Sequence, residues 1–183
     1  MNSVSRLALS AAAAIVVAAA APVAAEPRSP WLGGSVVSVR GFSEDSGLPA
    51  GEYFDLGLFV EPFRLKFLNP SASVRSLIPQ FPFRPGSSMI EFGVDIDLFS
   101  LRDHPLKGIM RQESALGPAL AASWAFEPSR GIAAGTLCLT AHALRLRTGD
   151  ARYNLLSPEL LLDSGLNPSG WGLRLFEFSY FLF

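Results

Sequence analysis

The feature that most constrains this chain is the strict alternation of apolar and acidic residues in segment 88–101. Ile90, Phe92, Val94, Ile96 and Leu98 alternate there with Glu91, Gly93, Asp95 and Asp97. A period of two predicts a β-strand, because successive side chains of a strand point to opposite faces of a sheet. One face is purely apolar and the other carries three carboxylates, so the two faces must meet different surroundings.

Seven other segments show strand-like patterns, which makes eight in all. They are residues 31–41, 52–60, 63–68, 116–126, 132–147, 151–162 and 171–183. Compact turns separate the later ones, as in a meander of antiparallel strands. We therefore expect an all-β fold, an antiparallel up-and-down β-barrel of about eight strands. The count falls to seven if residues 52–68 form one bent strand, and we expect residues 41–50 and 71–86 to form exposed loops.

The N-terminal segment has the pattern of a cleavable secretory signal. Arg6 precedes an apolar run over residues 7–21, and small residues at Val23 and Ala25 precede Glu26. The run is shorter than the roughly 20 residues that a membrane-spanning helix needs. We expect a signal peptide over residues 1–25 and a single domain over residues 26–183.

Composition limits the possible partners and cross-links. The formal net charge is −1, so the chain lacks the basic excess typical of proteins that bind nucleic acid. Cys138 is the only cysteine, so no disulfide can form within the chain. Almost half of the residues are apolar, yet no run after the signal is long enough for a spanning helix. Alternating strands closed into a barrel would reconcile these properties.

The C-terminal segment 171–183 is rich in aromatic residues and ends in Phe183. With the signal and the strand series, this segment resembles the closing strand of small bacterial outer-membrane β-barrels. The resemblance implies an outer-membrane location, contact with outer-membrane lipid, and recognition of Phe181 and Phe183 by the barrel-insertion machinery. It implies a monomer with a structural, adhesive or narrow-pore role, and the aromatics near strand ends (Trp31, Trp124, Trp171 and Tyr180) would form an interfacial girdle.

In such a barrel the charged face must point inward, because a charge facing lipid costs about 2–4 kcal/mol at mid-bilayer. We therefore expect Glu91, Asp95 and Asp97 in the barrel interior, paired with arginines from other strands. The candidate partners are Arg40, Arg64, Arg145, Arg147 and Arg174, of which Arg145 and Arg174 are the main candidates. Glu177 shares the face of Phe183, which requires either a bulge near Phe176 or another orientation of Phe183.

Two alternatives remain open at this point. A soluble periplasmic or secreted all-β protein, lipocalin-like or a sandwich, would show the same alternation and bind an apolar ligand. A barrel enzyme acting on lipid comes third: His104 lies beside Asp103 and His142 lies in a strand, but neither setting matches the His and Ser motif expected of a deacylase. We predict no catalytic residue, no cofactor and no metal ligand.

Overall fold

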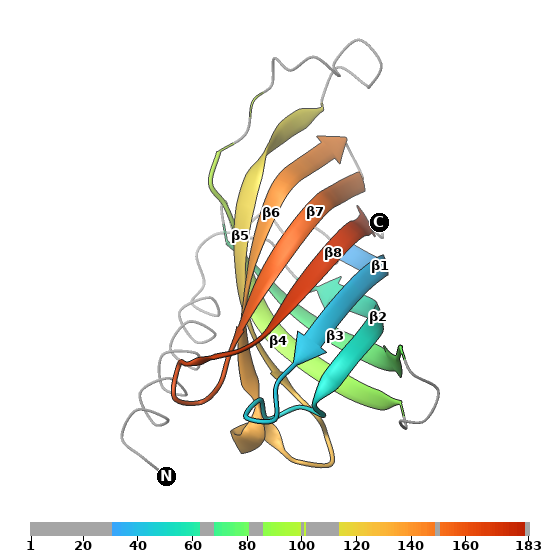
Figure 1. Ribbon diagram of the computed structural model, residues 1–183. Helices are drawn as coiled ribbons and strands as arrows, with labels where there is room; N and C mark the ends of the chain where they lie inside the picture. Colours follow the sequence, from blue (N-terminus) through green and yellow to red (C-terminus); the bar gives the residue numbers. More distant parts are fainter. Residues whose placement is uncertain are drawn as a thin grey trace.

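The structure, a computed structural model, describes residues 31–62, 68–80, 86–99, 101, 114–148 and 151–181. Within these residues the chain forms eight strands that close into one antiparallel barrel in sequence order (Figure 1). The strands are β1 (Trp31–Phe42), β2 (Gly51–Glu61), β3 (Leu68–Pro79), β4 (Ser87–Asp97), β5 (Ala115–Phe126), β6 (Thr136–Thr148), β7 (Ala151–Leu162) and β8 (Pro168–Phe181). Strand β1 pairs with both β2 and β8, which closes the barrel.

This topology confirms the predicted up-and-down β-barrel. It also decides the strand count, because β2 ends at Glu61 and β3 begins at Leu68, so residues 52–68 are not one bent strand. The expected strand over residues 63–68 lies outside the described residues except for Leu68. The expected signal peptide, His104, Arg64 and Phe183 also lie outside the described residues.

The prediction of a long loop over residues 71–86 is wrong. Residues 71–79 belong to β3, which pairs with β2 on one side and with β4 on the other. The prolines of this segment suggested a loop, but Pro79 is the last residue of the strand, and Pro82 and Pro85 lie outside the described residues. The outward residues of β3 include alanine and serine as well as Val74 and Ile78, so its alternation is weak in the sequence.

Four contiguous strands each contain one extra outward-facing residue at the same level of the barrel. Buried inward residues are three positions apart, instead of two, at Ser35/Ser38, His142/Arg145, Asn154/Ser157 and Arg174/Glu177. The pairing register therefore shifts where this group of strands meets its neighbours, at β1/β2 and at β5/β6. We call this feature the bulge belt. It changes which residues of β6, β7, β8 and β1 face the interior.

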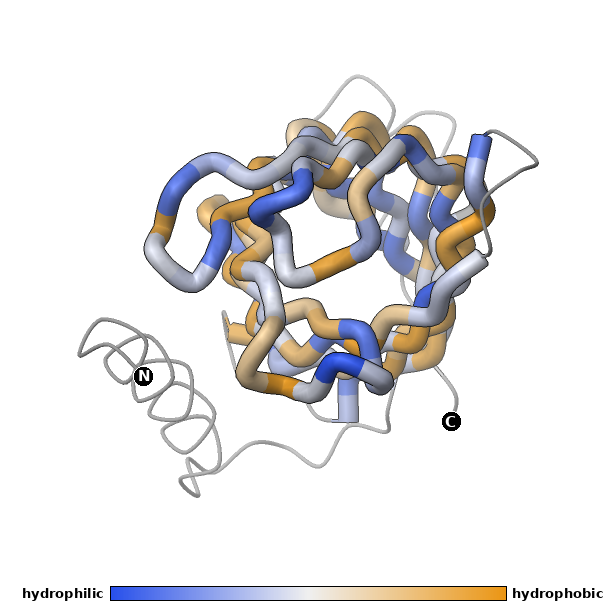
Figure 2. Tube along the Cα trace, turned by 60° about the horizontal axis from the view of Figure 1, so that its bottom comes forward, coloured by the Kyte–Doolittle hydropathy of each residue, from blue (hydrophilic) through white to orange (hydrophobic). Residues whose placement is uncertain are grey.

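The two ends of the barrel differ in what they carry. One end holds Trp31 and Phe181, and the opposite end carries the connections 43–50, 127–135 and 163–167 (Figure 1). The connection 127–135 contains a short 3-10 helix, η2 (Ile132–Ala134). Figure 2 views the barrel from this loop end and shows the strands as a ring around the lumen. No helix in the described part of the chain is long and apolar enough to cross a membrane.

Candidate functional site

Charge separates almost completely between the two faces of the barrel wall. The described strands contain 14 charged residues, and 13 of them point into the lumen. Eleven of these are buried, and Asp97 and Arg147 are partly exposed at the lumen edge. The exception is Glu52, which is exposed on the outside at the start of β2. The lumen is therefore the charged core of the protein, and it is the candidate functional site.

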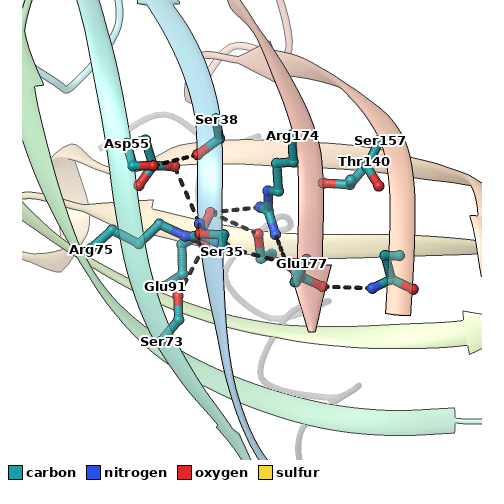
Figure 3. A network of polar contacts seen from close by, with 12 residues as sticks. Ser35, Ser38, Asp55, Ser73, Arg75, Glu91, Thr140, Ser157, Arg174 and Glu177 are labelled. Atoms are coloured by element: carbon teal, nitrogen blue, oxygen red, sulfur yellow. Dashed lines mark hydrogen bonds and ion pairs between the residues drawn. The ribbon is translucent and has the colours of Figure 1, made fainter. Parts of the chain in front are cut away.

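A central ion network fills the middle of the lumen and joins six strands (Figure 3). Its members are Arg40, Arg75, Arg174, Asp55, Glu91, Glu159 and Glu177. Arg40 Nε lies 3.1 Å from Asp55 Oδ2 and 2.8 Å from Glu159 Oε2. Arg75 Nε donates to Glu91 Oε2 at 2.5 Å, and Arg174 binds Glu159 directly. Each arginine thus contacts two or more carboxylates from different strands.

Hydroxyl side chains add further hydrogen bonds to this network. Ser73 donates to Glu91 at 3.0 Å, and Thr140 donates to Glu159 at 2.9 Å. Ser35 accepts a hydrogen bond of 2.8 Å from Arg75, as part of the contacts in Figure 3. Such partners are required because a buried charge without hydrogen bonds is costly.

A second ion cluster lies at the lumen edge. It joins the end of β4 to the end of β6, and β5 lies between these two strands. Arg145 binds both oxygens of Asp95, with Nη1 2.5 Å from Oδ1, and its Nη1 lies 2.8 Å from Asp97 Oδ1. Arg147 pairs with Asp97 as well. Asn154 connects this cluster to the central ion network, because it accepts from Arg145 at 2.7 Å and donates to Glu177 at 2.6 Å.

Arg152 and Glu61 form a separate ion pair, near the end of the barrel that holds Trp31. The guanidinium binds both carboxylate oxygens, and its Nη1 lies 2.9 Å from Glu61 Oε2. The Arg152 guanidinium also lies 5.9 Å from the ring centres of Trp31 and Phe59, within the range of cation–π contacts. An adjacent polar cavity of about 40 Å³ has room for a few water molecules.

Apolar side chains close the lumen at the loop end. The cluster consists of Phe42, Leu48, Tyr53, Leu77, Met89, Ala125, Cys138 and Leu161, all nearly inaccessible to solvent. Leu48 comes from the connection 43–50, which folds inward so that this side chain is only 1% exposed. Phe42 and Tyr53 pack with ring centres 5.8 Å apart. The interior is thus a layer of charge beneath a layer of hydrocarbon, and the side chains of both layers are almost fully buried.

The structure places all five predicted interior residues in the lumen and brings them together. Asp95 and Asp97 bind Arg145, and Glu91 lies 3.6 Å from Arg174. Of the other candidate partners, Arg40 joins the central ion network and Arg147 pairs with Asp97.

Sequence reasoning missed Asp55, Glu61, Arg75, Arg152 and Glu159 as members of the lumen. Asp55 and Glu61 alternate with an apolar face on β2, and that pattern could have identified them. Arg75 was missed because its segment was wrongly predicted to be a loop. Arg152 and Glu159 are an odd number of residues apart on β7, so a regular strand would place them on opposite faces. Both face inward only because of the bulge belt.

The orientation of Glu177 follows from the same belt. Glu177 is 5% exposed and binds Arg174, three residues earlier, at 3.0 Å. Leu175 and Phe176 both face outward between them, so the strand does carry a bulge near Phe176. The bulge therefore brings Glu177 into the lumen beside its partner.

His142 forms a serine–histidine–carboxylate arrangement inside the barrel. Its Nδ1 lies 2.9 Å from Ser157 Oγ, and its Nε2 lies 3.5 Å from Asp95 Oδ2. A nucleophilic serine must reach a substrate, yet Ser157 is 1% exposed and Asp95 is already bound by Arg145. The arrangement therefore ties β4, β6 and β7 together. No group of three or more His, Cys, Asp or Glu side chains in the described residues could hold a metal ion.

The outer face of the barrel is apolar and exposed. Its most exposed side chains include Leu58 at 68% and Val74 at 60%. Four aromatic residues, Tyr153, Phe176, Phe178 and Tyr180, pack against one another on β7 and β8, and the two tyrosine hydroxyls lie 3.2 Å apart. Trp171 is exposed on the same face at the loop end. Trp31, in contrast, is only 7% exposed on the lumen side, so its assignment to an outer girdle is wrong.

Comparison with known proteins gives no family: no family model, no curated protein and no solved structure matches this chain.

Proposed function

We propose that this chain is a small outer-membrane β-barrel protein with a closed lumen and a structural or adhesive role. The observation that carries this proposal is the distribution of charge across the barrel wall, with 13 of the 14 strand charges inside and a mainly apolar surface outside. A soluble barrel would expose its charges to water and bury its leucines and phenylalanines. The opposite arrangement suits a hydrocarbon solvent.

The dimensions of the apolar surface also fit a membrane. Trp171 and Tyr180 face outward on β8 at opposite ends of this surface and are nine residues apart. At about 3.3 Å per residue and a strand tilt of about 40°, they are separated by about 23 Å along the barrel axis. This is close to the apolar band of about 25 Å found on membrane barrels. Aromatic residues favour both edges of such a band.

The filled lumen favours a structural or adhesive role over a pore. Ion pairs cross the middle of the lumen, and the apolar cluster around Leu48 closes its loop end. The same filling argues against a lipocalin-like carrier, because an apolar ligand would need an apolar cavity instead of paired charges. It argues equally against catalysis at His142, since Ser157 is buried.

The membrane assignment can be tested by fractionation after export in a Gram-negative host. We expect the protein to require detergent for extraction and to change its gel mobility on heating, as a stable closed barrel does. A variant without residues 171–183 should lose the heat-dependent mobility, because β1 then has no partner to close the barrel. Release of the intact protein by osmotic shock without detergent would contradict the proposal.

The closed lumen can be tested separately in planar lipid bilayers. Purified, folded protein should give no discrete conductance steps, since charged and apolar layers block the lumen. Reproducible single-channel steps from the wild-type barrel would show a pore and would refute the closed state, while leaving the membrane location intact.

A further inference from the structure

The outer surface contains an open groove of about 430 Å³ across β8, β1, β2, β3 and β4. Its outward-facing walls are formed by Gly34, Leu56, Leu58, Val74, Ser76, Ser88 and Phe178. This volume lies within the range of small-molecule sites, about 300–1,000 Å³. We call this hollow the outer groove. The strands that form it lie side by side on one side of the barrel (Figure 1).

The groove exists because a glycine interrupts a row of large side chains. Gly34 pairs with Phe178 on β8 and with Leu58 on β2. A Cβ atom at Gly34 would lie 3.1 Å from the Gly57 carbonyl oxygen, 3.6 Å from the Leu58 side chain and 3.8 Å from the Phe178 ring, and Gly34 itself is buried among these neighbours. A larger side chain at this position would therefore have to extend outward into the groove between Leu58 and Phe178.

One side of the outer groove is polar. Ser76 and Ser88 are cross-strand partners, both exposed on the outer face, and Ser76 also pairs with Leu56. Exposed hydroxyls are unusual on a surface that is otherwise so apolar. Glu52, the outward-facing charge of the described strands, lies four residues before Leu56 on β2, toward the loop end.

We propose that the outer groove binds one phospholipid with an ammonium headgroup, of the phosphatidylethanolamine type. One acyl chain fills the hollow beside Gly34, the hydroxyls of Ser76 and Ser88 donate to an ester carbonyl, and Glu52 attracts the ammonium group. This inference rests on the proposed membrane location. Charge complementarity decides the headgroup, because the groove offers two hydroxyls, the carboxylate of Glu52 lies beyond the groove toward the loop end, and the described strands carry no outward cation.

Photolabelling of the full, folded chain in vesicles tests this site. The probe is phosphatidylethanolamine with a diazirine on one acyl chain, in vesicles of phosphatidylethanolamine and phosphatidylglycerol, and mass spectrometry locates the adducts. We expect adducts concentrated on β1, β2 and β3. Gly34→Leu, which places a side chain in the hollow, should lower groove labelling at least fivefold.

Three further variants make the result specific. Ala143→Leu places the same leucine side chain on the exposed outer face of β6, away from the groove, and should leave labelling unchanged. The pair Ser76→Leu and Ser88→Leu fills the groove from its polar side, and provides a second test if Gly34→Leu does not fold. Glu52→Gln should remove any preference for this probe over a phosphatidylglycerol probe with the same diazirine chain.

The outcomes separate the two proposals. Heat-dependent gel mobility of the vesicle-bound protein shows that each variant is folded. Even labelling around an inserted barrel, or cross-linked dimers through the groove, would overturn the lipid site but not the membrane location. Failure of the wild-type protein to insert, with no adducts on its outer face, would refute the proposed function itself.

Discussion

Arg40 on β1 and Glu91 on β4 bind each other across the lumen, with Nη2 3.0 Å from Oε1, although two strands lie between theirs. Both side chains are almost fully buried. Their contact shows that the interior of the barrel is held by charge pairs that span it, in addition to the hydrogen bonds between neighbouring strands.

Removal of the Arg40 side-chain charge should strongly destabilise the barrel. Arg40→Met leaves Asp55, Glu91 and Glu159 with one cation fewer, and loss of one partner of a buried pair costs about 3–5 kcal/mol. Urea unfolding in detergent micelles measures this free energy. Arg130→Met is the matched control, because Arg130 pairs with Glu127 at an exposed turn and should contribute about 0–1 kcal/mol. Equal effects of the two variants would contradict the central role of the lumen.

Arg152 and Glu61 should behave as a coupled pair. We expect Arg152→Met and Glu61→Gln each to destabilise the barrel, and the double variant to lose less than the sum of the two. The coupling free energy should be about 0.5–3 kcal/mol, as for residues in direct contact. A double-mutant cycle from unfolding curves gives this value. Strict additivity would mean that the bidentate contact contributes nothing to stability.

A charge on the outer face should be costly only in the middle of the apolar surface. Leu120 is exposed at the centre of β5, whereas Thr148 faces outward at the end of β6. In a lipid bilayer, Leu120→Arg should cost about 2–4 kcal/mol and Thr148→Arg about 0–1 kcal/mol. Unfolding measured in vesicles distinguishes the two. If Leu120→Arg is neutral, the outer face does not contact lipid.

The bulge belt should tolerate a change of residue but not a deletion. Leu156 lies in the belt with a φ of 54°, a left-handed conformation that strains a leucine by about 1–3 kcal/mol. Leu156→Gly should therefore retain the fold, with little loss of stability or a small gain. Deletion of Leu156 should prevent folding, because one end of β7 would then turn its inward residues toward the outside. Heat-dependent mobility of the two variants checks this, and a folded deletion variant would show that the belt is dispensable.

The turn between β7 and β8 should become less stable in acid. The backbone amides of Gly165 and Asn167 donate to Asp163 Oδ1 at 2.7 and 2.9 Å, and these bonds lower the pKa of the Asp163 carboxyl. A lowered pKa means that the charged form stabilises the turn above the ordinary carboxyl pKa, and that this contribution disappears as the pH falls through the lowered value. NMR titration of the Asn167 amide should give a midpoint below about 3.9, the usual aspartate value. A midpoint at or above that value would contradict the turn geometry.

Much of the wall of this barrel could be predicted from the sequence, because strand alternation is a local property. The apolar and acidic faces of β4 were identified from residues 88–101 alone, and so was the need for arginine partners such as Arg145. The segment that forms β3 was missed, since serine, alanine and proline give almost no contrast between its faces. Pairing with β2 and β4 stabilises that strand, and such pairing is not visible in one segment.

Strands with one apolar face and one charged face can be recognised from the amino-acid sequence, because a period of two is visible in neighbouring residues. Which charges meet depends on how the strands are arranged in space. Arg40 and Glu91 are 51 residues apart, and the bulge belt, shared by four strands, turns Glu159 and Glu177 inward. Closure of the barrel fixes these relations, since an inward side chain finds its partner only when all eight strands are in register.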